Sequence, residues 1–231
     1  RTEFGELLRA CDMVDGIDRI RFTSPHPKDF RTPVIAAMAE CESVCEHVHL
    51  PAQSGSSRVL KAMRRTYDRS RYLLLVDSLR DAIPDLALGT DLIVGFPGET
   101  DADFEETLSL VGEVGFDSAF TFIYSPRAGT EAASSPDQVH DDVKHARLEE
   151  LVDAVQRVAA QRNAARVGRV EEVLVEGRSR TDASLWRGRT RRNTTVNFTG
   201  VAAPGNLVDV VVDGATSTTL RGRAASLVTA A

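Results

Sequence analysis

The stretch from Thr90 to Thr100 constrains the fold of this chain more than any other. Its apolar run Leu92–Val94 ends in Gly95, Gly98 follows after a proline, and a helical pattern begins near Asp101. A buried strand that leads through a glycine turn into a helix is the βα unit of an α/β sheet, and such sheets bind ligands at the carboxyl ends of their strands. Glycine permits backbone angles that a Cβ forbids, and it allows a ligand to approach the main chain. A plain strand–turn–helix without a ligand is the alternative, because one glycine turn is weak evidence.

Three other segments repeat the pattern of a strand followed by a polar loop. They are Arg19–Ser24, His47–Pro51 and Phe116–Tyr124, and together with Leu86–Val94 they make four β-then-α units. Such units predict an α/β fold with a parallel sheet and right-handed crossovers. Four strands are too few for a closed eight-stranded barrel, so we expect a partial barrel or an open sheet. Helical patterns cover 3–12, 32–41, 57–65, 69–82, 103–114 and 139–163, with Leu73, Leu74, Val76 and Leu79 expected to face inward.

After Gly168 the pattern changes to short strands separated by Gly, Asp or Asn. The expected strands are Val170–Val175, Leu185–Thr190, Thr194–Phe198, Leu207–Val212 and Thr218–Leu220. Five short strands within about 60 residues predict a small antiparallel barrel of the OB type. We therefore expect a domain boundary near Arg166, with one domain at 1–165 and a second at 166–231.

Composition and charge limit the possible partners. The 231 residues are 42% hydrophobic and 27% charged, which is ordinary for a globular protein. No apolar run approaches the roughly 18–20 residues that cross a membrane, and the first residues do not resemble a signal peptide, so no membrane partner is expected. The formal charge is −6, yet residues 166–231 hold ten arginines against six acidic residues. A basic module on an acidic body favours a polyanionic partner, and a solvated charged surface is the alternative.

The three cysteines indicate a reducing compartment. Cys11, Cys41 and Cys45 are too few for a disulfide framework. This points to a cytoplasmic protein. Cys41 and Cys45 are four residues apart, but no third ligand follows at metal-site spacing, so we expect buried structural thiols there and no metal site.

The carboxyl ends of the four strands bring polar residues to one edge of the predicted sheet. These residues are Thr23, Ser24, His26, Gln53, Ser54, Asp91, Gly95, Glu99, Tyr124, Ser125 and Arg127. Such a set suits a polar ligand with amino-acid, ribose or base groups. Glu99 beside the glycine turn is a candidate general base, with helix capping as the alternative. No nucleophile–base pair or metalloprotease motif stands out, so no catalytic residue is named.

A basic, aromatic segment lies in the predicted barrel. Alternation along a strand places Arg187, Arg189 and Arg191 on one face, and Arg192 and Asn193 follow. Basic and aromatic groups on a small barrel are typical of RNA binding. An arginine-rich edge strand that prevents aggregation is the alternative. We favour RNA and name these five residues as RNA-binding candidates.

Four motifs carry a resemblance to a known family. They are His49–Arg65, Thr90–Thr100, Phe120–Thr130 and Gly188–Asn193. Together they resemble the radical-SAM methylthiotransferases over nearly the whole chain. The resemblance implies that 1–165 is the later part of a radical-SAM core, a partial (β/α)6 barrel lacking its first strands. It implies that 166–231 is the family's TRAM domain, an OB-like RNA-binding barrel.

The resemblance also implies cofactors. S-adenosyl-L-methionine (SAM) would lie across the strand ends, with Gln53, Ser54, Gly95 and Glu99 as the first candidates for contacts. The full set of cofactor-binding candidates is Ser24, His26, Gln53, Ser54, Asp91, Gly95, Glu99, Tyr124 and Ser125. The full-length enzymes of the family carry two [4Fe-4S] clusters, whose cysteine ligands are absent from this sequence. The pair Cys41–Cys45 lacks the third cysteine of the family's loop and falls two strands too late.

The implied activity is tRNA modification by radical methylthiolation of an adenosine at C2. Ser24–Asp29 and Pro51 favour the branch that acts on N6-dimethylallyladenosine next to the anticodon. The alternatives are a branch that acts on another tRNA adenosine or a ribosomal protein, and a non-catalytic RNA-binding protein. The sulfur donor is not indicated. We expect this chain to be a fragment that is inactive alone, because the cluster cysteines are missing.

Overall fold

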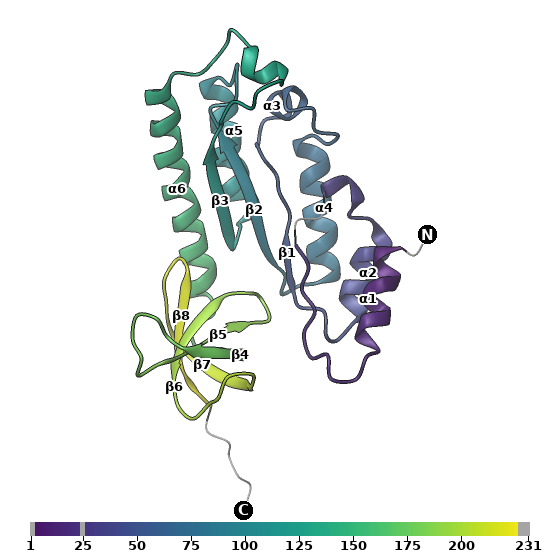
Figure 1. Cartoon of the computed structure of the whole chain (residues 1–231), viewed down its shortest axis with the longest axis vertical. Helices are drawn as coiled ribbons and strands as arrows, with labels where there is room; N and C mark the ends of the chain where they lie inside the picture. Colours follow the sequence, from purple (N-terminus) through teal and green to yellow (C-terminus); the bar gives the residue numbers. More distant parts are fainter. Residues whose placement is uncertain (1–2, 24–25, 226–231) are drawn as a thin grey trace, which may run out of the picture. The chain divides into compact units, whose positions relative to one another are not determined.

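The computed structural model describes residues 3–23 and 26–225 of the chain (Figure 1). The chain divides into two compact units, Arg1–Val158 and Ala159–Ala231. The division falls within the long helix α6 (Asp141–Ala164). The domain boundary predicted near Arg166 lies just beyond the end of this helix, and it stays a prediction.

A three-stranded parallel sheet lies at the centre of the first unit. The strands are in the order β1 (His47–His49), β2 (Ala87–Val94) and β3 (Ser118–Ile123). Asp91 in β2 is paired with Phe120 in β3. Because the strands are parallel, their carboxyl ends meet at one edge of the sheet. The predicted α/β class and its parallel sheet are confirmed.

Helices make up most of the remainder of this unit. They are α1 (Phe4–Asp12), α2 (Thr32–Glu40), α3 (Ser57–Ala62), α4 (Arg69–Ala82), α5 (Asp101–Val114) and the first part of α6, with 3₁₀ turns η1 (Pro27–Asp29) and η2 (Glu131–Ser134). Local sequence explains their ends. Thr100 caps α5 in a capping box with Asp103, and Gly115, at φ 62°, ends it in the left-handed region. Asp68 accepts a hydrogen bond from the Arg71 N–H at the start of α4, whose bounds match the prediction.

One inward-facing residue of α4 was predicted wrongly. Tyr72, Val76 and Leu79 are buried, but Leu74 is 67% exposed. The buried residues follow the three- and four-residue spacing of one helix face, and Leu74 lies on another. Because several consecutive residues of α4 are apolar, the sequence does not show which of them belong to the buried face.

The strand predicted at Arg19–Ser24 does not form in the described part of that segment. Within the described residues, Ile20 forms an isolated parallel β-bridge with Val44. The Ile20 N–H donates to the Ser43 carbonyl at 2.7 Å, and the Ile20 carbonyl accepts from the Cys45 N–H at 3.0 Å. The alternation of polar and apolar residues predicted an extended segment. A strand also needs a neighbouring segment with which to form a ladder of backbone hydrogen bonds, and here the pairing is limited to one bridge.

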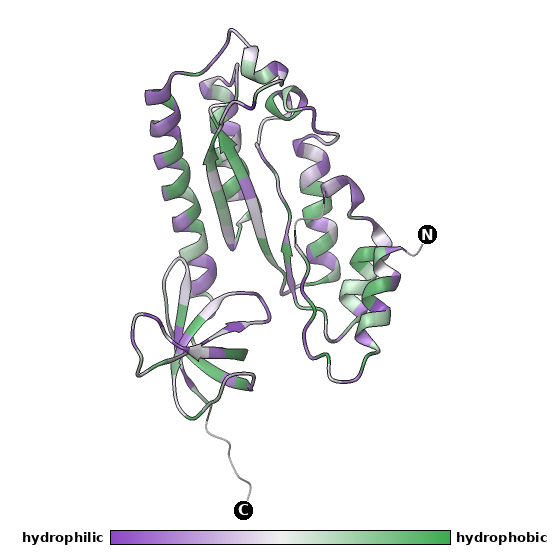
Figure 2. Ribbon diagram, in the orientation of Figure 1, coloured by the Kyte–Doolittle hydropathy of each residue, from purple (hydrophilic) through white to green (hydrophobic). Residues whose placement is uncertain are grey.

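The two faces of β2 have different environments. Leu88, Leu92 and Val94 are fully buried, whereas Asp91 and Ile93 on the other face are partly exposed. Residues two apart share a face of a strand, so one face joins the core with the helices and the other stays accessible. Figure 2 shows hydrophobic residues along β2 and β3 and alternating hydrophilic and hydrophobic bands along α6.

The second unit contains a closed five-stranded barrel. Its strands are β4 (Val170–Arg178), β5 (Trp186–Thr190), β6 (Thr195–Thr199), β7 (Leu207–Ala215) and β8 (Thr219–Ala224), in the order β4-β5-β6-β8-β7. The predicted small barrel is confirmed, although one pair, β6 with β8, is parallel. Its core includes Val173, Val196, Phe198 and Leu220.

No helix within residues 3–23 and 26–225 is both long and apolar enough to cross a membrane.

Replacing Gly188 with alanine should destabilise the barrel. A Cβ at this position would meet the Leu174 carbonyl oxygen at 2.3 Å and a Val173 methyl group at 2.5 Å. Forcing atoms into a packed core costs about 1–3 kcal/mol. Trp186 is the single tryptophan and packs against the barrel core. Urea unfolding followed by tryptophan fluorescence should therefore show a lower midpoint for Gly188→Ala.

The matched control is Gly112→Ala. Gly112 lies in α5 of the first unit, and nothing lies within 4 Å of its added Cβ. Alanine in a helix is favoured over glycine by about 0.5–1 kcal/mol, so this variant should stabilise the first unit. The unfolding transition of the barrel, which Trp186 fluorescence reports, should be unchanged. An unchanged midpoint in Gly188→Ala would contradict the packing argument.

Candidate functional site

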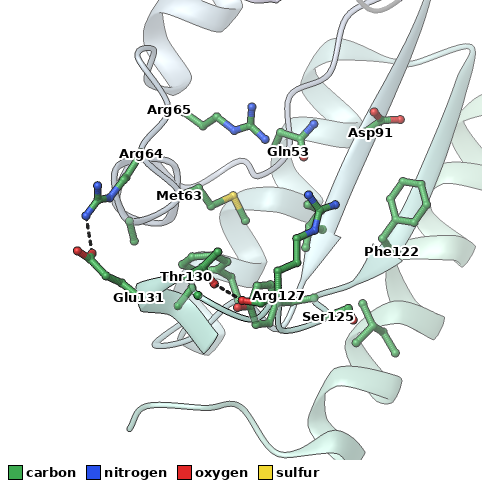
Figure 3. Close-up of a pocket in the computed structure, with 17 residues that line it drawn as sticks. Gln53, Met63, Arg64, Arg65, Asp91, Phe122, Ser125, Arg127, Thr130 and Glu131 are labelled. Carbon is green, nitrogen blue, oxygen red and sulfur yellow. Dashed lines mark hydrogen bonds and ion pairs between the residues drawn. The ribbon is translucent and has the colours of Figure 1, made fainter. Parts of the chain in front are cut away.

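A cavity of about 870 Å³ lies at the carboxyl ends of β2 and β3 (Figure 3). Its walls come from these strand ends, from the loop after β1, from the end of α3 and from the segment after β3. The polar and aromatic residues that line it are Gln53, Arg64, Arg65, Asp91, Phe96, Phe122, Tyr124, Ser125, Arg127, Thr130 and Glu131. Small-molecule sites typically have volumes of about 300–1,000 Å³ and a few convergent polar groups. The cavity has both properties.

Gln53 is held at the cavity in an unusual backbone conformation. Its φ is 71°, in the left-handed region, although it has a side chain. Its N–H donates to the Asp91 carbonyl at 2.8 Å and its carbonyl accepts from the Ile93 N–H at 2.9 Å. A non-glycine residue in this region is uncommon and persists where the surroundings impose it, as at binding sites. These bonds to β2 impose it here.

Asp91 extends from β2 into the cavity and is paired with a histidine. The His49 Nε2 and Asp91 Oδ1 atoms are 3.0 Å apart, and the two side chains are 12% and 26% exposed. Gly89 lies beside them, and a Cβ there would come within 3.0 Å of His49 Nδ1. The absent side chain of Gly89 thus leaves room for the His49 ring, which orients the Asp91 carboxylate.

Tyr124 and Ser125 continue from β3 and also line the cavity. The Tyr124 N–H donates to the Val94 carbonyl at 2.8 Å, so β3 stays beside β2 to its end. The Tyr124 ring meets the Phe96 ring edge to face, with centroids 5.0 Å apart. Four of the nine cofactor candidates, Gln53, Asp91, Tyr124 and Ser125, therefore come together around one space.

Ser54 is not among the cavity-lining residues. It is buried, and its Oγ accepts from the Ser56 N–H at 3.1 Å and lies 3.4 Å from the Thr107 Oγ1. The neighbouring Ser56 Oγ donates to Asp103 at 2.6 Å. Burial opposes ionisation of Asp103, but hydrogen bonds from Arg58, Ser56 and Thr100 outweigh it and hold the pKa of Asp103 well below its usual range. Ser54 thus belongs to a network that joins its loop to α5, and its role as a cofactor contact stays a prediction.

Gly95 and Glu99 interact with each other and with α6. The Gly95 N–H donates to Glu99 Oε1 at 2.9 Å, and Arg147 Nη1 donates to the same oxygen at 2.8 Å. Burial raises the pKa of Glu99, although the Gly95 N–H and Arg147 act to lower it. At Gly95, with φ 72°, a Cβ would meet Lys144 Cγ at 2.4 Å. Neither residue lines the cavity, so the geometry favours a packing role, and a cofactor contact stays a prediction for both.

His26 lies outside the cavity lining, and Ser24 lies outside the described residues. His26 Nδ1 accepts from the Lys28 N–H at 3.2 Å at the start of η1. Its ring meets the Tyr67 ring edge to face at 5.6 Å. Partial burial lowers the pKa of His26, and the charges of Lys28 and Arg65 lower it further. Contacts of either residue with a cofactor stay predictions.

Several lining residues were not among the candidates from the sequence. Arg65 and Phe122 line the cavity, and so does Arg127, which we expected at the strand ends but did not name as a cofactor contact. Alternation along β3 could have indicated Phe122, because it shares a face with Phe120. Arg64–Arg65 is visible in the sequence only as the basic end of a helix.

The described cysteines do not fit an iron–sulfur cluster. Cys41 and Cys45 are buried in the core, and burial raises the pKa of the Cys41 thiol. No group of three or more His, Cys, Asp or Glu side chains arranged to hold a metal ion occurs in the described ranges. Cluster ligation needs several thiolates around one point, so no chemistry is assigned to a cluster on these residues.

The arginines predicted to bind RNA divide into two groups. Arg187 and Arg189 share the outer face of β5, and both pair with Glu176, at 3.3 Å and 3.2 Å. Arg189 Nη1 also donates to the Asn193 carbonyl at 3.1 Å. Arg191 and Arg192 lie beyond the end of the strand, where Arg192 is buried. The predicted common face thus contains two arginines, and RNA contacts stay a prediction for all five residues.

Two family descriptions match the chain. Residues 1–111 match the Radical SAM superfamily and residues 164–225 match the TRAM domain. The core and barrel assignments from the sequence resemblance agree with these matches.

Relatives named tRNA-2-methylthio-N(6)-dimethylallyladenosine synthase are similar over most of the chain. The protein of Clostridium botulinum (strain Okra / Type B1) is 52% identical over 223 residues, which are 96% of this chain and 50% of the relative. That of Alkaliphilus oremlandii is 51% identical over 90% of this chain and 44% of its own length. The chain thus spans about half the length of the curated relatives it matches. A solved structure of coproporphyrinogen III oxidase from Escherichia coli, described as a radical SAM enzyme, is 20% identical, with a TM-score of 0.49 over 58% of this chain and 31% of that one.

Replacing Arg147 with methionine should destabilise the first unit in a pH-dependent way. Arg147 is buried beside Glu99, and removing one partner of a buried ion pair costs about 3–5 kcal/mol. The pKa of Glu99 is already raised by burial, and it should rise further without the arginine. A raised pKa in the folded chain favours the protonated form, so the loss should be largest near about pH 8 and smaller near about pH 5. Urea unfolding followed by circular dichroism at both pH values measures it.

Arg157→Met is the matched control, because Arg157 is exposed on the same helix. Its effect should stay within about 0.5 kcal/mol at either pH. An equal loss for Arg147→Met at both pH values would show that Glu99 is not the group left unpaired.

Proposed function

Because this chain belongs to the radical SAM methylthiotransferase family, we propose that it acts in tRNA modification. The proposed reaction is the SAM-dependent radical methylthiolation of C2 of N6-dimethylallyladenosine next to the anticodon. One observation carries the proposal: relatives with that name are 52% identical over 96% of the chain. The cytoplasm is the proposed site of action, since tRNA is the proposed partner.

The strand-end cavity supports the cofactor part of the proposal. Gln53, Asp91 and Ser125 supply amide, carboxylate and hydroxyl groups within one space. These groups match the amino, carboxyl and ribose groups of SAM, so the residues present fit this cofactor. When bound, SAM would supply the carbon radical and a methyl group for the reaction.

The chain's own residues would bind and orient the ligands. Asp91, oriented by His49, would accept hydrogen bonds from ligand hydroxyl or ammonium groups. The Gln53 amide can both donate and accept, and the backbone bonds to β2 hold its position. The Phe96 and Tyr124 rings would exclude water from their wall of the cavity.

The barrel supports the RNA part of the proposal. Arg187 and Arg189 lie together on the outer face of β5. Each is partly neutralised by the shared Glu176, and an RNA phosphate would compete for the same guanidinium groups. Phosphate contacts of this kind position RNA and make its binding depend on salt.

The activity is tested with the whole protein that contains this chain, expressed in a bacterium that lacks tRNA methylthiolation. Mass analysis of its tRNA nucleosides should show the methylthiolated form of N6-dimethylallyladenosine. Appearance of another methylthiolated nucleoside would favour a different branch of the family. Absence of any methylthiolated product would contradict the proposal.

Asp91→Asn should weaken SAM binding by this chain about tenfold, since charge-assisted hydrogen bonds are worth about 1.5–3 kcal/mol. Titration calorimetry with SAM measures the change. Asp77→Asn is the control, because Asp77 is exposed on α4, away from the cavity lining, and should bind SAM as the unchanged chain does. Equal affinity for both variants would remove Asp91 from the cofactor site.

A further inference from the structure

An arginine is stacked on the tryptophan at one end of the barrel. The Arg178 guanidinium carbon lies 3.7 Å from the centre of the Trp186 ring. Arg178 ends β4, Trp186 begins β5, and the two residues are partners in the antiparallel ladder. So close an approach requires the planar guanidinium to lie flat on the ring, which is the stacking geometry that arginine favours on aromatic side chains.

Both members of this stack are held in place. The Trp186 ring packs against the barrel core, and its Nε1–H donates to the Gly200 carbonyl at 3.1 Å. Gly200 has φ 130°, and a Cβ there would meet the Ala224 Cβ at 2.6 Å, so its backbone lies tightly against the end of β8. Arg178 Nη1 donates to the Ser184 carbonyl at 3.3 Å in the loop before β5. The guanidinium is thus fixed at one edge and on one face.

The other face of the Arg178 guanidinium is accessible. Arg178 is exposed, and since Trp186 occupies one face of the guanidinium, the accessible surface is the opposite face. A guanidinium is weakly hydrated, and the unpaired bases of RNA stack on guanidinium planes as they do on aromatic rings. Because Trp186 already orders this side chain, little conformational entropy is lost when a base stacks on it.

A row of polar side chains crosses the outer face of the barrel beside the stack. Arg187 follows Trp186 on β5, its ladder partner on β6 is Asn197, and the partner of Asn197 on β8 is Arg221. Neighbouring strands lie about 4.8 Å apart, so the two arginines are separated by about 10 Å with the amide between them. Asn197 Oδ1 is buried and has no hydrogen-bond partner within the described residues. The row therefore has hydrogen-bonding capacity that the barrel itself does not use.

Arg221 is well placed to bind a phosphate. Its side chain is 70% exposed, and its Nε donates to Asp213 Oδ1 at 2.9 Å. The guanidinium lies over Gly214, where a Cβ would come within 3.0 Å of Nη2. The bond to Asp213 engages Nε, and the two terminal NH₂ groups are further donors that match the oxygens of a phosphate.

We propose that the Arg178–Trp186 stack is a platform for one unpaired base of RNA, and that Arg187, Asn197 and Arg221 hold the phosphate backbone beside it. The inference rests on the proposed function, in which RNA is the partner of the barrel, and extends it to a preference for unpaired nucleotides. Backbone contacts alone give no such preference, because paired and unpaired RNA both carry phosphates. The stack supplies it, since the bases of a duplex are already covered by their neighbours.

The test measures binding of the full chain to an RNA stem-loop with an unpaired loop and to an RNA duplex with the same number of nucleotides. The unchanged chain should bind the stem-loop about tenfold more tightly, as expected for one stacked base. Arg178→Lys keeps the positive charge but removes the planar group. This variant should lose the preference, bind the duplex as the unchanged chain does, and keep the slope of log affinity against log salt.

Arg180→Lys is the matched control, because Arg180 is exposed two residues further along the chain and its charge is also kept. It should change neither affinity. A urea transition followed by the fluorescence of Trp186, the single tryptophan, should show that each variant is folded under the binding conditions.

Arg221→Gln tests the backbone contact. It should weaken binding of both RNAs by the same factor and make the salt slope shallower by about 1, because one phosphate contact is lost. An unchanged salt slope would remove Arg221 from the proposed contact.

The outcomes separate the platform from the proposed function. If the unchanged chain binds both RNAs equally, or if Arg178→Lys keeps the preference for the stem-loop, the platform is overturned while the proposed function stands. If Arg178→Lys weakens both RNAs equally, Arg178 acts on the backbone or the fold, and the platform is again overturned. Displacement of the stem-loop by poly-glutamate as readily as by unlabelled RNA would assign the surface to an acidic protein segment. If the unchanged chain binds neither RNA, the RNA part of the proposed function fails, and the platform fails with it.

Discussion

The first unit depends on the two-sided character of β2. Leu92 and Val94 fill the core on one face, while Asp91 and Ile93 meet the cavity on the other. Because side chains alternate along a strand, a shift of one residue would bury the carboxylate and expose the leucine. The backbone bonds of Gln53 to β2 hold this register at the cavity edge. One strand, β2, therefore contributes side chains to the hydrophobic core on one face and to the cavity on the other.

Charged groups in this unit serve two different purposes. Glu99 and Arg147 satisfy each other in a buried pair that ties α6 to the loop after β2. Arg65 and Arg127 instead reach the cavity without a carboxylate partner among the described residues. A buried charge is costly unless it is paired, whereas a charge in an open cavity is solvated and stays available to a ligand. Whether a charged side chain stabilises the packing or can bind a ligand thus depends on its ion-pair partner and its position more than on its residue type.

The candidate site shows where reasoning from the sequence succeeds and where it stops. Asp91 and Tyr124 were predicted at the cavity because parallel strands end at one edge. Glu99 met the same criterion, yet its carboxylate turns to Arg147, 48 residues away in the chain. Arg65 met no criterion, because it follows a helix and reaches the cavity only through the left-handed turn at Arg64.

The sequence by itself determined the local elements: the α4 bounds, the strands β2 and β3, and the five short strands of the barrel. These follow from periodicity and from capping residues, which act within a few positions of the chain. The tertiary structure alone decided whether Arg19–Ser24 had a neighbour to pair with, and which charged groups found partners. Both outcomes depend on residues far apart in sequence, because backbone ladders and ion pairs form between segments that only folding brings together.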